Sequence, residues 1–292
     1  MLIRDQEERE YFIHQYSMLK PRIRQQDRVY WDSYITCSMK DERAVFHNLQ
    51  RVENTISFLR CHDVPDQDDC VLDIGCGSGP FLPAFAKASK HLTETDFSSR
   101  ILAMAEETAH ICRFSNVDFR LFDISRDDPE RKGWVRQFDL VFSALVPECY
   151  NLPAIRKMET MSRKYCFLQM LLLKKDPLAT EIFHEAGISE GLWAVDKTEK
   201  FQLLDHILCL EGCHPNVTYY RYQGDPIPKT EDEYISILLH SLTGIVLTDA
   251  DINRLKDLIR KKADAAGRLS SCTEYVLGSI LWDIRDKKEF YE

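Results

Sequence analysis

The glycine-rich segment after the first apolar run is the part of the sequence best suited to chemistry. Residues 71–79 read VLDIGCGSG, an apolar stretch that ends with glycine at three alternate positions. Glycine lets the backbone turn sharply, and it lets a ligand lie against the main chain where a Cβ atom would collide. The spacing G-x-G-x-G differs from the G-x-G-x-x-G of dinucleotide-binding proteins, and the G-K-[ST] ending of a P-loop is absent. The segment therefore predicts a ligand-binding loop, and its spacing disfavours NAD, FAD and a nucleoside triphosphate as the ligand.

Acidic residues end the next two predicted strands. Asp96 lies 21 positions after Gly75, where a doubly wound sheet places the acid that accepts hydrogen bonds from ribose hydroxyls. Asp123 ends the following strand, and a carboxylate there can accept a hydrogen bond from an exocyclic amine such as adenine N6. Because the carboxyl ends of consecutive parallel strands meet at one edge of a sheet, we expect the loop and both acids to share one crevice.

Strands and helices are predicted to alternate from about residue 70 onward, because short apolar runs alternate with stretches that repeat every three or four residues. This order predicts an α/β fold with a doubly wound, seven-stranded, mostly parallel sheet and helices on both faces. We expect strands at 70–74, 91–95, 117–122, 138–143, 165–172, 216–222 and 275–284. We expect helices at 81–88, 98–112, 152–162, 177–186, 201–210, 230–242 and 248–266.

The ends of the chain suggest additions to this core. Residues 1–60 have helical periodicity without strand-like alternation, so we expect an N-terminal helical cap before a larger domain at 61–292. A helical insertion is expected at about 224–267, before the last strand. An aromatic group in the cap either folds over the ligand as a lid or packs the cap onto the sheet. Its members are Tyr30, Trp31 and Tyr34.

On these residues the chain resembles the class I S-adenosylmethionine-dependent methyltransferases, over roughly residues 70–172. VLDIGCGSG is similar to the family's first motif, and TDFSSRILAMAEE to its second-strand acid and the helix that follows. FDISR and FDLVFSALVP look like the third and fourth strand ends. The resemblance implies a Rossmann-like sheet with an antiparallel last strand, S-adenosyl-L-methionine as cofactor, and methyl transfer as the activity.

The resemblance also implies which residues contact the cofactor. Asp73 would position the amino end of the methionine moiety, Asp96 the ribose, and Asp123 the adenine. The whole implied set is Asp73, Gly75, Cys76, Gly77, Gly79, Asp96, Phe97, Asp123, Ile124, Ser143 and Ala144.

Methyl transfer from a sulfonium needs an in-line nucleophile at short range, and a general base only when the acceptor is protonated. Glu148 could serve as that base, Tyr150 could orient an acceptor, and Cys149 could contact a soft one. Each of them could equally be a loop or packing residue, and no catalytic residue is assigned. The Asn/Asp-Pro-Pro-Tyr/Phe signature of amino-group methylation is absent after the fourth strand, which weakens that substrate class.

The bulk of the predicted cap and insertion favours an enclosed small-molecule acceptor over an open groove for a polymer. Two alternatives stay open. One is a non-catalytic module that binds S-adenosylmethionine or S-adenosylhomocysteine, and the other is a methyltransferase acting on RNA or protein. A net charge of −9 and a pI near 5.6 disfavour a nucleic-acid partner.

The remaining composition sets further expectations. The longest apolar stretch, 165–173, is far shorter than the ~20 residues that span a bilayer, so we expect no membrane partner. The N-terminal stretch lacks the apolar core of a secretory signal, which predicts a cytoplasmic protein.

The ten cysteines are scattered, which favours free thiols. Cys209, Cys213 and His214 lack a second ligand pair, so no metal is expected.

Overall fold

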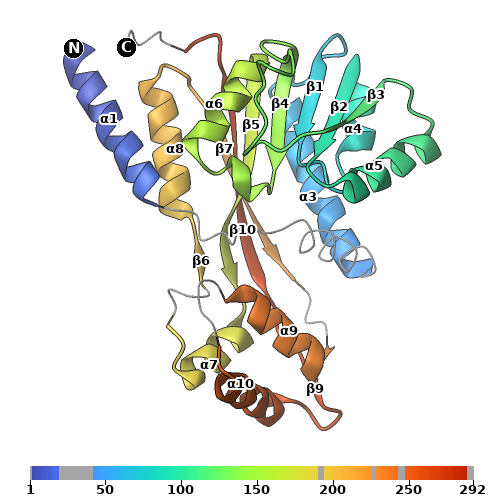
Figure 1. Cartoon of the computed structure of the whole chain (residues 1–292), viewed down its shortest axis with the longest axis vertical. Helices are drawn as coiled ribbons and strands as arrows, with labels where there is room; N and C mark the ends of the chain where they lie inside the picture. Colours follow the sequence, from blue (N-terminus) through green and yellow to red (C-terminus); the bar gives the residue numbers. More distant parts are fainter. Residues whose placement is uncertain (1, 20–41, 190–193, 225–227, 243–246, 288–292) are drawn as a thin grey trace.

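A mixed sheet of eight strands forms the centre of the molecule (Figure 1). The computed structural model describes residues 2–19, 42–189, 194–224, 228–242 and 247–287. Seven strands lie in the order β3-β2-β1-β4-β5-β10-β7, and β6 pairs with β5 beside this path. The strands are β1 (Cys70–Ile74), β2 (His91–Asp96), β3 (Val117–Leu121), β4 (Phe138–Ala144), β5 (Ser162–Lys175), β6 (Val195–Asp196), β7 (Asn216–Gln223) and β10 (Glu274–Asp283).

The strand directions confirm the doubly wound, mostly parallel sheet. Strands β1 to β5 pair in parallel, and β10 runs antiparallel between β5 and β7. The predicted seven strands are all present, and the two-residue β6 is additional. Sequence periodicity could not reveal a strand of this length.

Helices cover both faces of the sheet, each over its own apolar cluster. The clusters contain residues such as Trp282 and Phe201 on one face, and Phe142 and Phe85 on the other. The first face carries α1 (Leu2–Met18), α6 (Leu152–Met161) and α8 (Thr198–Leu210), and the second carries α3 (Glu42–Arg60), α4 (Leu82–Ala88) and α5 (Ser99–Cys112).

The described parts of the first sixty residues therefore lie on opposite faces of the sheet. Helix α1 packs on α8, and the Tyr16 hydroxyl donates to the Tyr150 carbonyl oxygen at 3.1 Å. Helix α3 lies beside β7, where the Tyr220 hydroxyl donates to the Asn54 carbonyl oxygen at 3.0 Å. The aromatic residues predicted as a lid or staple, Tyr30, Trp31 and Tyr34, lie outside the described residues.

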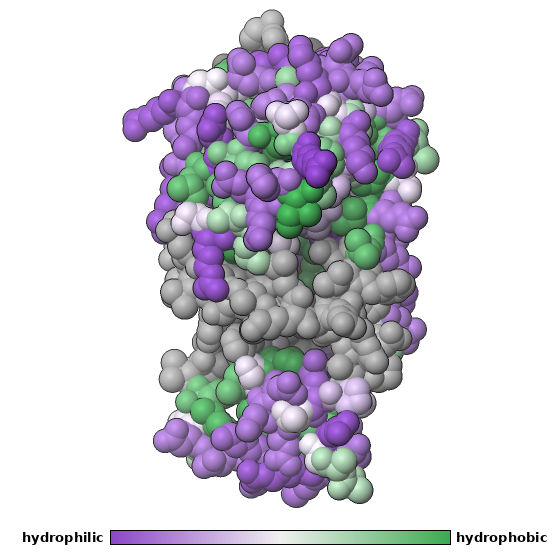
Figure 2. All heavy atoms as spheres, turned by 90° about the vertical axis from the view of Figure 1, so that its right-hand side faces the viewer, coloured by the Kyte–Doolittle hydropathy of each residue, from purple (hydrophilic) through white to green (hydrophobic). Residues whose placement is uncertain are grey.

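A second body, which we call the helical module, lies below the carboxyl edge of the sheet in Figure 1. It comprises α7 (Pro177–Ala186), α9 (Glu231–Ser241), α10 (Asp249–Lys262) and a ribbon of β8 (Lys229–Thr230) with β9 (Arg268–Leu269). Its helices share a separate apolar cluster, and its outer surface is mainly hydrophilic (Figure 2). The module thus contains the predicted insertion together with α7, which precedes it in the chain.

Short polar side chains fix where the module's helices begin. The Thr248 hydroxyl accepts from the Asp251 N–H while the Asp251 carboxylate accepts from the Thr248 N–H, and Thr230 with Glu233 repeats this capping box. At α7, Asp176 Oδ1 accepts from the Ala179 N–H. These caps satisfy N–H groups that have no partner within the helix, so each start is set locally.

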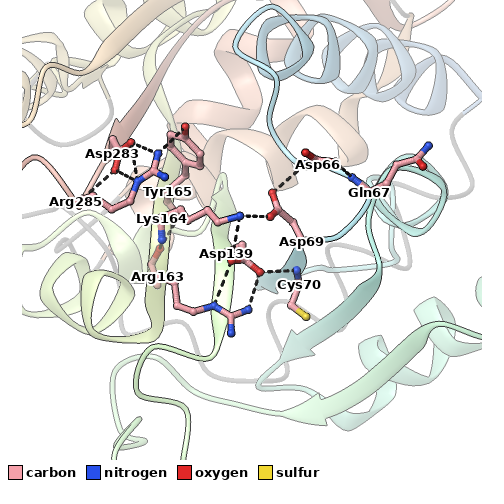
Figure 3. Close-up of polar contacts among 11 residues, drawn as sticks. Asp66, Gln67, Asp69, Cys70, Asp139, Arg163, Lys164, Tyr165, Asp283 and Arg285 are labelled. Atoms are coloured by element: carbon pink, nitrogen blue, oxygen red, sulfur yellow. Dashed lines mark hydrogen bonds and ion pairs between the residues drawn. The ribbon is translucent and has the colours of Figure 1, made fainter.

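The opposite, amino edge of the sheet is held by a buried ion-pair network (Figure 3). Asp139 of β4 is 5% exposed, and it accepts from Arg163 Nη2 at 2.6 Å and from the Cys70 N–H at 2.9 Å. Lys164 lies between Asp139 and Asp69. The network joins the starts of β1, β4 and β5 at the edge away from the glycine loop. We therefore assign it a role in stabilising the fold.

We predict that Asp139→Asn lowers the free energy of unfolding by about 1 kcal/mol at neutral pH, because the buried carboxylate loses its charge-assisted bonds to Arg163 and Lys164, whose side chains are 43% and 37% exposed. Burial alone would raise the pKa of Asp139, but Arg163, the Cys70 N–H and Lys164 lower it. The contribution is therefore present above the ordinary aspartate pKa of about 3.9 and is lost as the pH falls through the lower folded-state value.

Urea unfolding across this pH range measures the effect. The matched control is Asp118→Asn, whose side chain is 48% exposed and should change stability by less than about 0.5 kcal/mol. Equal losses in the two variants would contradict a structural role for the network.

Candidate functional site

The glycine loop leaves β1 at the carboxyl edge of the sheet and is tied to β2. The N–H groups of Gly75 and Cys76 both donate to the Thr95 carbonyl oxygen at 2.8 Å. Gly75, Gly77 and Gly79 have φ values of +72°, +60° and +78°, which are conformations that residues with a Cβ rarely adopt. The turn itself therefore favours glycine at each of these positions.

The glycines differ in what lies beside them. A Cβ at Gly75 would come within 2.4 Å of Val146 Cγ2, and one at Gly79 within 3.2 Å of the Ala105 Cβ. At these two positions the close approach is made by the protein's own side chains. Gly77 is half-buried between them, and close approach of a ligand to the loop backbone stays a prediction.

Asp96 holds the loop against the end of β2. Its Oδ2 accepts from the Gly77 N–H at 3.3 Å, its Oδ1 accepts from the Ser98 N–H at 2.9 Å, and the residue is 5% exposed. Ser98 in turn caps α5 by accepting from the Ile101 N–H. The predicted ribose acid and the glycine loop therefore do meet, and Phe97 lies half-buried beside them.

Three carboxyl groups are buried behind this loop. Asp73 of β1 lies opposite Glu94 of β2 in the parallel register, and Asp96 follows two residues later on the same strand face. Burial, reinforced by Asp96 and opposed by Arg51, raises the pKa of Asp73 to about 8. Burial and the carboxyl groups of Asp73 and Asp96 raise the pKa of Glu94 well above its usual range. The site is therefore poised to receive positive charge.

Arg51 brings a cation from α3 to this edge. Its guanidinium lies 4.9 Å from the centre of the Phe81 ring, and Nη1 donates to Gln169 Oε1 at 3.3 Å. Gln169 is fully buried in β5, and its amide nitrogen donates to the Thr55 and Ser279 hydroxyls at 2.9 Å. Neither Arg51 nor Glu94 belongs to a recognisable motif, so the sequence alone did not single them out.

The predicted adenine-side residues lie at the ends of β3 and β4. Asp123 Oδ1 accepts from the Ser125 N–H at 2.9 Å, and the neighbouring Ile124 is 4% exposed. Ser143 is fully buried, its hydroxyl lies 3.4 Å from the Ile74 carbonyl oxygen, and Ala144 is half-buried. The parallel sheet brings these ends to the same edge as the glycine loop (Figure 1).

The three acceptor-side candidates have different surroundings. Glu148 is half-buried, and burial, together with the Asp123 carboxylate, raises its pKa. Tyr150 is 1% exposed, its hydroxyl lies 3.4 Å from both the Gln169 carbonyl oxygen and the Leu171 nitrogen, and Cys149 is fully buried. The core positions of Tyr150 and Cys149 fit the packing alternative, Glu148 lies at the edge, and the acceptor-side roles of all three stay predictions.

Other candidates lie away from this edge. Among the described residues, no group of three or more His, Cys, Asp or Glu side chains is arranged to hold a metal ion, and the described cysteines are free thiols. A shallow hollow of about 580 Å³ lies between Glu185 and the charged face of α10, distant from the glycine loop. None of the described helices combines the length and apolar character needed to cross a bilayer.

Comparison with known proteins finds a match to a methyltransferase domain within the chain. Residues 71–164 match the family model described as a methyltransferase domain. A curated relative is the 23S rRNA (uracil(1939)-C(5))-methyltransferase RlmD of Pseudoalteromonas translucida, 28% identical over 139 residues. That match covers 48% of this chain and spans only 30% of the relative.

Two solved structures share the fold. The YcgJ protein of Bacillus subtilis is 13% identical, with a TM-score of 0.50 over 82% of this chain and 100% of that one. A putative methyltransferase of Bacillus halodurans is 14% identical, with a TM-score of 0.50 over 77% of this chain and 97% of that one. Residues 71–164 of the chain thus match a methyltransferase domain, and the chain shares the fold of these two structures.

Proposed function

We propose that the whole chain transfers the methyl group of S-adenosylmethionine to a small-molecule acceptor. The observation that carries this proposal is the closure of the glycine loop on Asp96 in front of buried carboxyl groups. When bound, the cofactor supplies an electrophilic methyl group on a sulfonium. The protein then has to bind the cofactor and the acceptor, orient them and exclude water. These steps account for much of the rate of such transfers.

The residues at the carboxyl edge fit this cofactor chemically. The unpartnered Asp73 Oδ2 suits the positive methionine end, and Asp96 suits the ribose hydroxyls. Asp123 and the Ile124 backbone would hold the adenine. Lining contacts are proposed from Gly75, Cys76, Gly77, Gly79, Phe97, Ser143 and Ala144.

Glu148 is the proposed general base for an acceptor that must lose a proton. A carboxylate whose pKa is raised by burial binds a proton more readily than an exposed one. Its place after β4, beyond Ser143 and Ala144, lies where the family resemblance puts substrate-facing groups.

The helical module supports a small acceptor. It is attached through the extended ends of β5, β7 and β10, which all reach the carboxyl edge (Figure 1). Specificity elements in such sheets lie at this edge. We propose that the acceptor binds between the edge and the module, within a cytoplasmic protein, and that residues 1–60 and 61–292 act as cap and catalytic domain.

A second candidate acceptor is RNA, because the name of the curated relative describes it as an rRNA methyltransferase. The net charge of −9 disfavours it.

We predict that Asp96→Asn weakens S-adenosylhomocysteine binding by about 2 kcal/mol, roughly thirtyfold, since hydroxyl donors lose a charged partner. Isothermal titration calorimetry measures this affinity. Glu107→Gln on the exposed side of α5 is the control and should bind like the wild type. Unchanged affinity in the Asp96 variant would contradict the site assignment.

We further predict that the small-molecule fraction of a cell extract supports formation of S-adenosylhomocysteine, whereas the RNA and protein fractions do not. The measurement is product formed per fraction by mass spectrometry. Turnover with the RNA fraction alone would favour the RNA candidate. Absence of turnover with every fraction would favour the non-catalytic binding module.

A further inference from the structure

Glu94 is an unexplained feature of the carboxyl edge. It lies in β2 and is fully buried, and among the described residues its carboxyl oxygens meet no N–H or O–H donor, only the weak thiol donor of Cys76. Its register partner across the strand pair is Asp73, and paired residues of parallel strands point to the same face of the sheet. Asp73 also leaves Oδ2 buried and without a partner.

The surroundings give this pair little compensation. The titratable and charged groups that act on it are Cys76 of the glycine loop, Asp96 of β2, and Arg51 of α3. Cys76 is a neutral thiol, because burial and the nearby carboxyl groups raise its pKa. Helices α4 and α5 contribute apolar side chains to this face, Phe85 and Ala105 among them.

Two adjacent carboxylates cannot both stay ionised in such a place. Burying one unpaired charge is strongly unfavourable in free energy. A second like charge beside it raises this cost further. Below about pH 8 the two groups therefore hold at least one proton, with apparent pKa values that belong to the pair. Such a pair binds a cation in exchange for its proton.

We propose that Glu94 is a cofactor-binding residue, and that with Asp73 it exchanges a shared proton for the α-ammonium group of the cofactor. The proton passes to the solvent, the ammonium keeps its own protons, and no covalent bond forms or breaks elsewhere. This inference rests on the proposed function, and it adds that cofactor affinity is coupled to pH.

The sign of the coupling follows from the exchange. At low pH the pair holds its proton and binding must release it, so affinity rises with pH, by up to about tenfold per pH unit where the release is complete. Above the pKa of the pair the proton is already gone, and affinity becomes independent of pH. A carboxylate that kept its proton on binding would give no such slope.

The test is calorimetric titration of the full chain with S-adenosylhomocysteine, whose cation is the α-ammonium, in buffers of different ionisation enthalpy. At about pH 6.5 the wild type should release about one proton, and its affinity should rise between about pH 6 and pH 8. Glu94→Gln should release fewer protons than the wild type and show a shallower pH slope, because the buried Asp73 keeps part of its raised pKa, and it should bind about tenfold more weakly at about pH 8. Glu107→Gln should behave like the wild type.

The outcomes separate the two proposals. Binding by the wild type without proton release overturns the role of Glu94 and leaves the proposed function standing. Proton release equal in Glu94→Gln and wild type also overturns it. Lack of any binding by the wild type overturns the proposed function and this inference together. Should Glu94→Gln not fold by circular dichroism, the wild-type proton count and pH slope still decide.

Discussion

The parallel register of β1 against β2 is the constraint on which the site depends. It sets Asp73 beside Glu94 and places Thr95 where its carbonyl oxygen receives the first two N–H groups of the glycine loop. The loop then turns back far enough for Asp96 to accept from Gly77. A slip of one residue would send the buried carboxyl groups to the other face, so the same pairing that forms the sheet also builds the binding edge.

The two ends of the sheet have different electrostatic character. At the amino edge, Asp139 and Asp69 are paired with cations, and burial there is offset by hydrogen bonds. At the carboxyl edge, the described residues offer no cation, N–H or O–H group in hydrogen-bond contact with Asp73 Oδ2 or the Glu94 oxygens. Stable proteins rarely leave buried polar groups unmatched, and such groups concentrate at functional sites. The contrast therefore supports a cation-binding role for the carboxyl edge.

Local sequence signals predicted most of the fold. The seven strands, the helices between them and the antiparallel last strand followed from periodicity and from the family resemblance, because each element carries its own apolar pattern. The short β6 and the grouping of α7 with α9 and α10 depend on contacts between distant segments, which no local pattern records.

The site was predicted in part for the same reason. The glycines and Asp96 belong to a motif, whereas Arg51 arrives from a helix that precedes the sheet. Glu94 sits in the stretch LTETD, whose alternation looks like an ordinary half-exposed strand. The sequence left Tyr150 open between a pocket and a packing role, because its partners, the backbone groups of β5, become known only once the strands are assembled.

A crystal structure of the chain with S-adenosylhomocysteine tests the central claim most directly. We expect electron density for the ligand along the glycine loop, with the ribose on Asp96, the adenine toward Asp123 and the amino group toward Asp73. Density at another position, or a loop covered by the chain's own side chains with the ligand absent at saturating concentration, would contradict it.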